Sequence, residues 1–115
     1  MTRCLPVGTL LIAALLALPF DASALTMNQV AAMCAAYPGE CSEHPLVQAY
    51  VGGALDLIAT LDEQTEYLED VYCKQPAELF DVPAIIRYLE AQRGEYAERN
   101  AMLLVIRYLE DNGGC

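Results

Sequence analysis

Apolar residues recur every three or four positions in four separate stretches of this 115-residue chain, and none of the four shows a sustained alternation of apolar and polar residues. Such spacing is typical of helices with one buried face, whereas period-two alternation marks strands. Glycine and proline punctuate the stretches, and no linker is long enough to separate two domains. The pattern therefore predicts an all-α domain of four helices.

The first two helices have recognisable starts. In residues 26–37, Thr26 followed by Gln29 fits a capping box, and Pro38 ends the helix. In residues 42–61, Ser42 is the expected N-cap and Pro45 sits in the tolerated first turn. The buried face of this second helix should contain Val47, Tyr50, Val51, Ala54, Ile58 and Leu61.

Two adjacent glycines, Gly52 and Gly53, lie in the middle of the second helix. Each costs a helix interior about 1 kcal/mol relative to alanine. We expect the pair to let another helix approach closely, within the chain or between chains; a kink is the alternative.

The third helix is expected from Asp81 to Gly94, and the fourth from Glu95 to about Leu109. Both contain the pentapeptide IRYLE, at 86–90 and 106–110, which we interpret as a similar packing demand on two amphipathic helices. The buried stripes should be Val82, Ile85, Ile86 and Leu89 in the third helix and Met102, Val105, Ile106 and Leu109 in the fourth. Arg87 and Arg107 should cover the core edge with their aliphatic stems.

The N-terminal stretch has the features of a secretory signal peptide. Arg3 precedes an apolar run from Leu10 to Leu18, and the segment closes on the small residues Ala22-Ser23-Ala24. A membrane anchor is the alternative, but the run is short for a span. We expect cleavage after residue 24 and a soluble, exported, periplasmic domain comprising residues 25–115.

Signal removal takes Cys4 and leaves four cysteines, an even number that indicates two disulfides in a small exported domain. In an up-down arrangement the second and fourth helices run the same way and bring Cys73 and Cys115 to the same end. We therefore predict the pairs Cys34–Cys41 and Cys73–Cys115. The alternative joins Cys34 to Cys115 and Cys41 to Cys73. Zinc is not expected, because the chain has no CxxC pair.

The formal net charge is −10, and loss of Arg3 and Asp21 with the signal leaves it unchanged. Nucleic acid and anionic membrane surfaces are poor partners for such a domain. A basic protein is the natural complement, although the charge could also serve solubility alone.

The acids are densest in DEQTEYLED, residues 62–70, which holds five carboxylates and could be an extra helical turn or a loop. If helical, Glu63, Glu66 and Asp70 share a face beside Tyr67. Apart from a solvated connector, the natural interpretation is a partner-binding surface. Its candidate residues are Asp62, Glu63, Glu66, Tyr67, Leu68, Glu69 and Asp70.

Catalytic chemistry has little support in the sequence. The single histidine, His44, lies beside Pro45 without an obvious nucleophile, and no glycine-rich phosphate loop is present. We predict no enzymatic activity, no cofactor and no metal.

Several motifs occur in a familiar order: a cysteine-bearing first helix, AYVGGALDLI, YCKQP, IIRYLE, LLVIRYLE and a final cysteine. This order resembles the Rap/Tai family of type VI secretion immunity proteins, which neutralise peptidoglycan amidase effectors in the periplasm. The best-matched parts are Tyr50-Val51-x-Gly53, Cys73-x-x-Pro76 and residues 101–115. The resemblance implies an amidase effector as partner, inhibited by occlusion of its active site, and a homodimer.

A rival class is a small acid-stress or holdase-type periplasmic chaperone. Such proteins are also small, helical and disulfide-bonded, and they bind clients through an exposed apolar surface.

Overall fold

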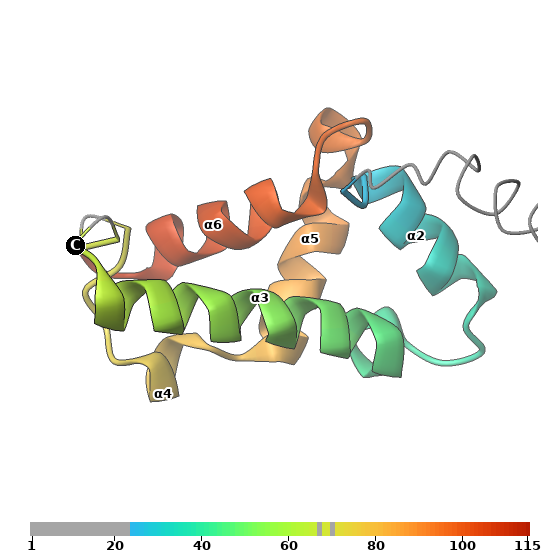
Figure 1. The fold of residues 1–115 in the computed structure, drawn as a ribbon. Coiled ribbons are helices and arrows are strands. Elements are labelled where there is room, and N and C mark those ends of the chain that lie inside the picture. The colour runs from blue at the N-terminus through green and yellow to red at the C-terminus, as the bar shows by residue number, and fades with distance from the viewer. Residues whose placement is uncertain (1–23, 67, 70) are drawn as a thin grey trace, which may run out of the picture.

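The computed structural model describes residues 24–66, 68–69 and 71–115 of the chain (Figure 1). Across this part of the chain the regular elements are helices, and Thr26 and Asn100 form an isolated β-bridge. The all-α fold class is therefore confirmed. The expected signal peptide lies outside the described residues except for Ala24. The elements are α2 (Met27–Ala36), the short 3₁₀ helix η1 (Cys41–Glu43), α3 (Pro45–Gln64), the single-turn α4 (Pro76–Leu79), α5 (Val82–Tyr96) and α6 (Ala101–Asn112).

The capping box predicted for the first helix is present. The Thr26 hydroxyl accepts a hydrogen bond from the Gln29 backbone N–H at 3.2 Å, and Gln29 Oε1 accepts one from the Thr26 N–H at 2.8 Å. Two N–H groups that would otherwise have no partner are thereby satisfied. The helix ends at Ala36, directly before Tyr37 and Pro38, as expected.

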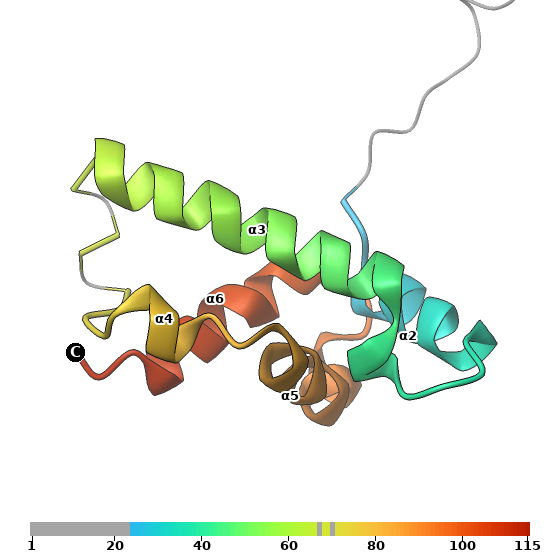
Figure 2. The same cartoon turned by 90° about the horizontal axis from the view of Figure 1, so that it is seen from below.

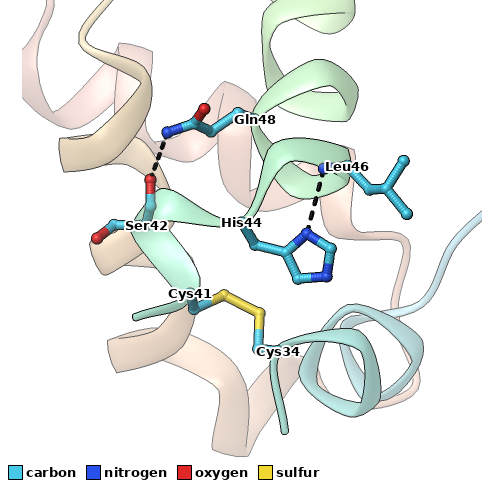
Figure 3. Close-up of a disulfide and its surroundings, with 6 residues drawn as sticks. All are labelled: Cys34, Cys41, Ser42, His44, Leu46 and Gln48. Carbon is cyan, nitrogen blue, oxygen red and sulfur yellow. Dashed lines mark hydrogen bonds between the residues drawn. A yellow bond between two sulfur atoms is a disulfide. The ribbon is translucent and has the colours of Figure 1, made fainter. Parts of the chain in front are cut away.

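The start of α3 differs from the prediction. The N-cap is His44, whose Nδ1 accepts a hydrogen bond from the Leu46 N–H at 3.1 Å, with Pro45 in the first turn (Figure 3). Ser42 instead lies buried in η1, where its carbonyl oxygen accepts a 2.8 Å hydrogen bond from Gln48 Nε2. The prediction of Ser42 as N-cap was wrong because the chain makes a separate 3₁₀ turn before the helix begins.

The boundary between the last two helices also differs from the prediction. Helix α5 continues through Gly94 to Tyr96, and α6 begins at Ala101, where Asn100 Oδ1 accepts a hydrogen bond from the Met102 N–H at 3.0 Å. Gly94 was wrongly predicted to end a helix. A glycine costs an exposed helix interior only about 1 kcal/mol, which the packing of Ile85, Ile86 and Leu89 outweighs.

The helices do not form a simple up-down bundle. Helices α3 and α6 run in the same direction, whereas α5 crosses them; it is seen lengthwise in Figure 1 and nearly end-on in Figure 2. The predicted up-down arrangement is therefore wrong for α5. The prediction that the helices before Cys73 and Cys115 run in the same direction is correct, since these are α3 and α6. The core at this crossing contains Val47, Val51, Ile85, Ile86, Leu89, Leu104, Val105 and Leu109.

Both predicted disulfides are confirmed. Cys34 and Cys41 link α2 to η1 with a Cα–Cα distance of 4.9 Å (Figure 3). Cys73 and Cys115 link the segment before α4 to the chain end, with a Cα–Cα distance of 5.2 Å. Helices α3 and α6 run toward the same end of the domain (Figures 1 and 2). The segment with Cys73, which follows α3, and the chain end with Cys115, which follows α6, therefore meet there.

Candidate functional site

The acidic segment, residues 62–70, begins inside helix α3 and continues beyond its end. Helix α3 continues as far as Gln64, and the Thr65 N–H then donates to the Leu61 carbonyl oxygen at 2.8 Å to close the last turn. Of the two possibilities that the sequence left open, the helical face shared by Glu63 and Glu66 does not form, because α3 ends between them. Tyr67 and Asp70 lie outside the described residues.

The described carboxylates of the acidic segment face solvent. Asp62, Glu63, Glu66 and Glu69 are all exposed, whereas Leu68 is half-buried. After α3 the chain turns back: the Val71 N–H donates a 3.0 Å hydrogen bond to the Leu68 carbonyl oxygen. The turn thus presents carboxylates outward and holds the one described apolar side chain against the domain.

The Cys73–Cys115 disulfide fixes the far side of the acidic segment. The Glu69 carbonyl oxygen lies 3.9 Å from Cys73 Sγ and 3.8 Å from Cys115 Sγ. The N–H groups of Cys73 and Lys74 both donate to the carbonyl oxygen of the buried Gly113, at 3.0 and 2.9 Å. The segment is therefore anchored at one end by α3 and at the other by the C-terminus of α6.

Tyr72, which follows the acidic segment in the chain, is buried in the core. Its side chain is 6% exposed, and its ring packs edge-on against Phe80 with centroids 5.7 Å apart. Burial and the nearby carboxylate of Asp62 raise the pKa of the Tyr72 phenol. Its hydroxyl has no hydrogen-bond partner among the described residues. Tyr72 thus connects the acidic segment to the core by packing.

Two exposed leucines lie beside the acidic segment. Leu57 is 60% exposed and Leu61 is 42% exposed. Leu61 was wrongly placed on the buried face, and Leu57 was missed. Gly53, Leu57 and Leu61 follow one another at intervals of four residues and so lie on one face of α3. This second face, separate from the one that carries Val47 and Val51, was the sequence pattern that could have indicated the exposed leucines.

The predicted close packing at the two glycines is absent within the described chain. A Cβ atom built on Gly52 or on Gly53 would meet nothing within 4 Å. The helical cost of each glycine, about 1 kcal/mol, is therefore not offset by an internal contact in this part of the protein.

A hollow of about 700 Å³ lies between α2, η1 and α5. Its rim carries Arg87 and Arg93 together with Glu40 and Glu90. Its lining includes the buried side chains of Met27, Ile86 and Leu89, together with the exposed Ala35.

The histidine has a structural role here. Besides capping α3, the His44 ring packs on Tyr37 with centroids 4.5 Å apart. In the described ranges no three His, Cys, Asp or Glu side chains gather to hold a metal ion. Nor does any described helix have the length and apolarity needed to cross a bilayer.

Comparison of the chain with protein-family models, with characterised proteins and with solved structures finds no match.

Proposed function

We propose that this protein is a periplasmic immunity-type inhibitor, which binds a peptidoglycan amidase effector of type VI secretion and occludes its active site. The observation that carries the proposal is the anchored acidic segment: exposed carboxylates on a turn held between the end of α3 and the Cys73–Cys115 disulfide. The sequence resemblance to the Rap/Tai family supplies the partner class.

The anchoring matters for affinity. A loop ordered only on binding loses conformational entropy in the complex, whereas a loop already fixed at both ends loses less. The contacts of Glu69 with the disulfide and of Cys73 with Gly113 hold the C-terminal end of the segment against the end of α6. Anchored ends of this kind lower the entropy that the segment would lose on binding in an enzyme cleft.

The chemistry of the segment divides into two roles. The exposed carboxylates accelerate encounter with a basic rim, an effect that salt screens. Tyr67, which lies among these acids in the sequence, should contribute more to the lifetime of the complex, because buried tyrosines are common among the residues that dominate interface affinity.

The proposal is tested with two variants and one control. The triple substitution Glu63→Lys, Glu66→Lys and Asp70→Lys should slow association and weaken its dependence on salt. Tyr67→Ala should accelerate dissociation. The matched control reverses three exposed carboxylates elsewhere, Glu40, Glu43 and Glu95, and should leave both rates close to wild type. All variants must keep the wild-type thermal midpoint. If both test variants still protected cells against the effector as well as wild type does, the acidic segment would not be the binding surface.

A second candidate function is client binding by a small periplasmic chaperone. The exposed leucines of α3 favour it, since a holdase needs accessible apolar surface. Suppression of the aggregation of an acid-unfolded client by stoichiometric protein, abolished in the variant Leu57→Ser, would support the chaperone. A lack of suppression together with amidase inhibition would support the inhibitor.

A further inference from the structure

The two disulfides differ in exposure. Cys73 and Cys115 are both exposed, whereas Cys41 is 6% exposed and Cys34 is half-buried. Reduction by a thiol needs one sulfur that the attacking thiolate can reach and a second sulfur that leaves as a thiolate. In Cys73–Cys115 both sulfurs belong to exposed residues, so neither role is blocked by burial.

The buried Cys41 hinders exchange at the other disulfide in both directions. As the attacked residue it is shielded by the core cluster to which it belongs. As the leaving group it would carry a negative charge in apolar surroundings, which disfavour charge. Cys34 lines the hollow between α2 and α5, but attack on it from there still places the charge on Cys41. A thiol should therefore distinguish between the two disulfides.

A cation lies beside the exposed disulfide. Lys74 directly follows Cys73, and its side chain packs on Gly114: a Cβ atom on that glycine would lie 3.2 Å from Lys74 Cε and 3.4 Å from Lys74 Cγ. Cysteines that react readily are typically exposed and near a positive charge, which stabilises the thiolate. Lys74 thus favours Cys73 as the sulfur that leaves.

We propose that Cys73–Cys115 is an exchange site for the dithiol of a thiol–disulfide oxidoreductase. A thiolate of the dithiol forms a bond with Cys115 Sγ, the bond between the two cysteines breaks, and its electron pair passes to Cys73 Sγ, which takes a proton from water. The second thiol of the reductant then displaces Cys115 and closes the reductant's own disulfide. The protein gains two electrons and two protons, and the dithiol loses them.

Reduction at this site releases one anchor of the acidic segment. The Glu69 carbonyl oxygen lies 3.9 Å from Cys73 Sγ and 3.8 Å from Cys115 Sγ, so separation of the two sulfurs removes the contact that joins the segment to the chain after α6. The second disulfide, Cys34–Cys41, still holds α2 to η1. The two-thiol form therefore keeps its core while the acidic segment becomes less restrained. A lower affinity of this form for an amidase rests on the proposed inhibitor function; the exchange site does not.

Timed reduction with dithiothreitol tests the exchange site. Free thiols of the oxidised full chain, including Cys4, are first blocked with iodoacetamide. Thiols that appear after dithiothreitol is added are trapped with N-ethylmaleimide and assigned by peptide mapping. Cys73 and Cys115 should be labelled about 100-fold faster than Cys34 and Cys41, because the buried disulfide needs local opening. The two-thiol form should keep the helical circular dichroism signal. Equal rates, or earlier labelling of Cys34 and Cys41, would overturn the proposal.

A monothiol tests the direction of attack and the role of Lys74. With glutathione as the probe, the mixed disulfide should form on Cys115, and N-ethylmaleimide should label Cys73. The variant Lys74→Gln should slow the exchange about threefold, whereas the matched control Lys74→Arg, which keeps the charge, should exchange at the wild-type rate. Glutathione on Cys73 would overturn the proposed direction. Equal slowing in the two variants would overturn the role of the charge.

The consequence for inhibition is measured separately. The two-thiol form, trapped with N-ethylmaleimide, should inhibit a type VI secretion peptidoglycan amidase about tenfold more weakly than the oxidised form, since ordering of the released segment costs entropy. Equal inhibition by both forms would show that the disulfide does not regulate the binding surface. Because the labelling experiments contain no amidase, failure of the exchange site and failure of the inhibitor function give different results.

Discussion

The hydroxyl of Tyr88 donates a hydrogen bond of 2.8 Å to Oδ2 of Asp111, and this contact ties α5 to the last turn of α6. The Tyr88 ring also packs edge-on against Tyr108, with centroids 5.4 Å apart and an interplanar angle of 74°. Tyr88 and Tyr108 occupy the same place in the two IRYLE pentapeptides. The repeated sequence thus supplies both rings at the contact between the two helices.

The substitution Tyr88→Phe removes the hydrogen bond and keeps the ring pair. We expect the free energy of unfolding to fall by about 1 kcal/mol, as is typical for one partly exposed hydrogen bond. Urea unfolding monitored by circular dichroism measures the change. Tyr108→Phe is the matched control, since it leaves the Tyr88–Asp111 bond in place. Equal losses in the two variants would contradict the assigned role of this bond.

Alkaline pH should destabilise the fold through the same group. Burial, then the hydrogen bond and charge of Asp111, raise the pKa of Tyr88 from 10.0 to about 12. The folded protein therefore holds this proton more tightly than the unfolded chain does. The stabilisation is complete below pH 10 and is lost as pH rises toward 12. Urea unfolding at pH 9, 10 and 11 should show a steeper decline for wild type than for Tyr88→Phe. Parallel declines would contradict the prediction.

Two glycine substitutions should change stability in opposite directions. At Gly113 a Cβ would lie 2.6 Å from Tyr72 Cβ and 2.8 Å from Tyr72 Cα, so Gly113→Ala should destabilise by about 2 kcal/mol. At Gly94, inside α5, a Cβ would meet nothing within 4 Å, so Gly94→Ala should stabilise by about 0.5–1 kcal/mol. Thermal midpoints compare the two. A lower midpoint for Gly94→Ala would show that its space is occupied.

Removal of each disulfide should cost a different amount. The sequence separation is 42 residues for Cys73–Cys115 and 7 for Cys34–Cys41. Loop-closure entropy then favours the longer link, about 4 against about 2.5 kcal/mol. The paired serine variants should rank in this order in urea unfolding. The reverse order would indicate that buried packing at Cys41, 6% exposed, outweighs chain entropy.

The sequence was sufficient for the fold class, the first capping box and both disulfides, because each rests on local spacing or on direction along the chain. It was insufficient where the burial of a residue depends on which other helices pack against its own. Ile86 and Ile106 occupy equal places in the two pentapeptides, yet Ile86 is 1% exposed and Ile106 is 40% exposed. Helix α5 contacts α2, α3, η1 and α6, whereas α6 is contacted mainly by α5 and α3. Periodicity cannot reveal how many sides of a helix are covered.

The candidate site was predictable in composition but not in shape. The density of carboxylates in residues 62–70 marked the segment, and the structure places its described acids in solvent. Where α3 ends at Gln64 could not be predicted, since none of the residues around it breaks a helix. The exposed Leu57 was missed because α3 has two apolar lines and only one faces the core.

The most direct measurement is a titration of peptidoglycan hydrolysis. A peptidoglycan amidase effector of type VI secretion, chosen from the same genome, is purified, and its activity is followed while the oxidised protein is added. Activity should fall linearly to zero near one chain per enzyme, and the variant with lysine at positions 63, 66 and 70 should need an excess. Full activity of the amidase in a tenfold excess of wild-type protein would contradict the proposed inhibition.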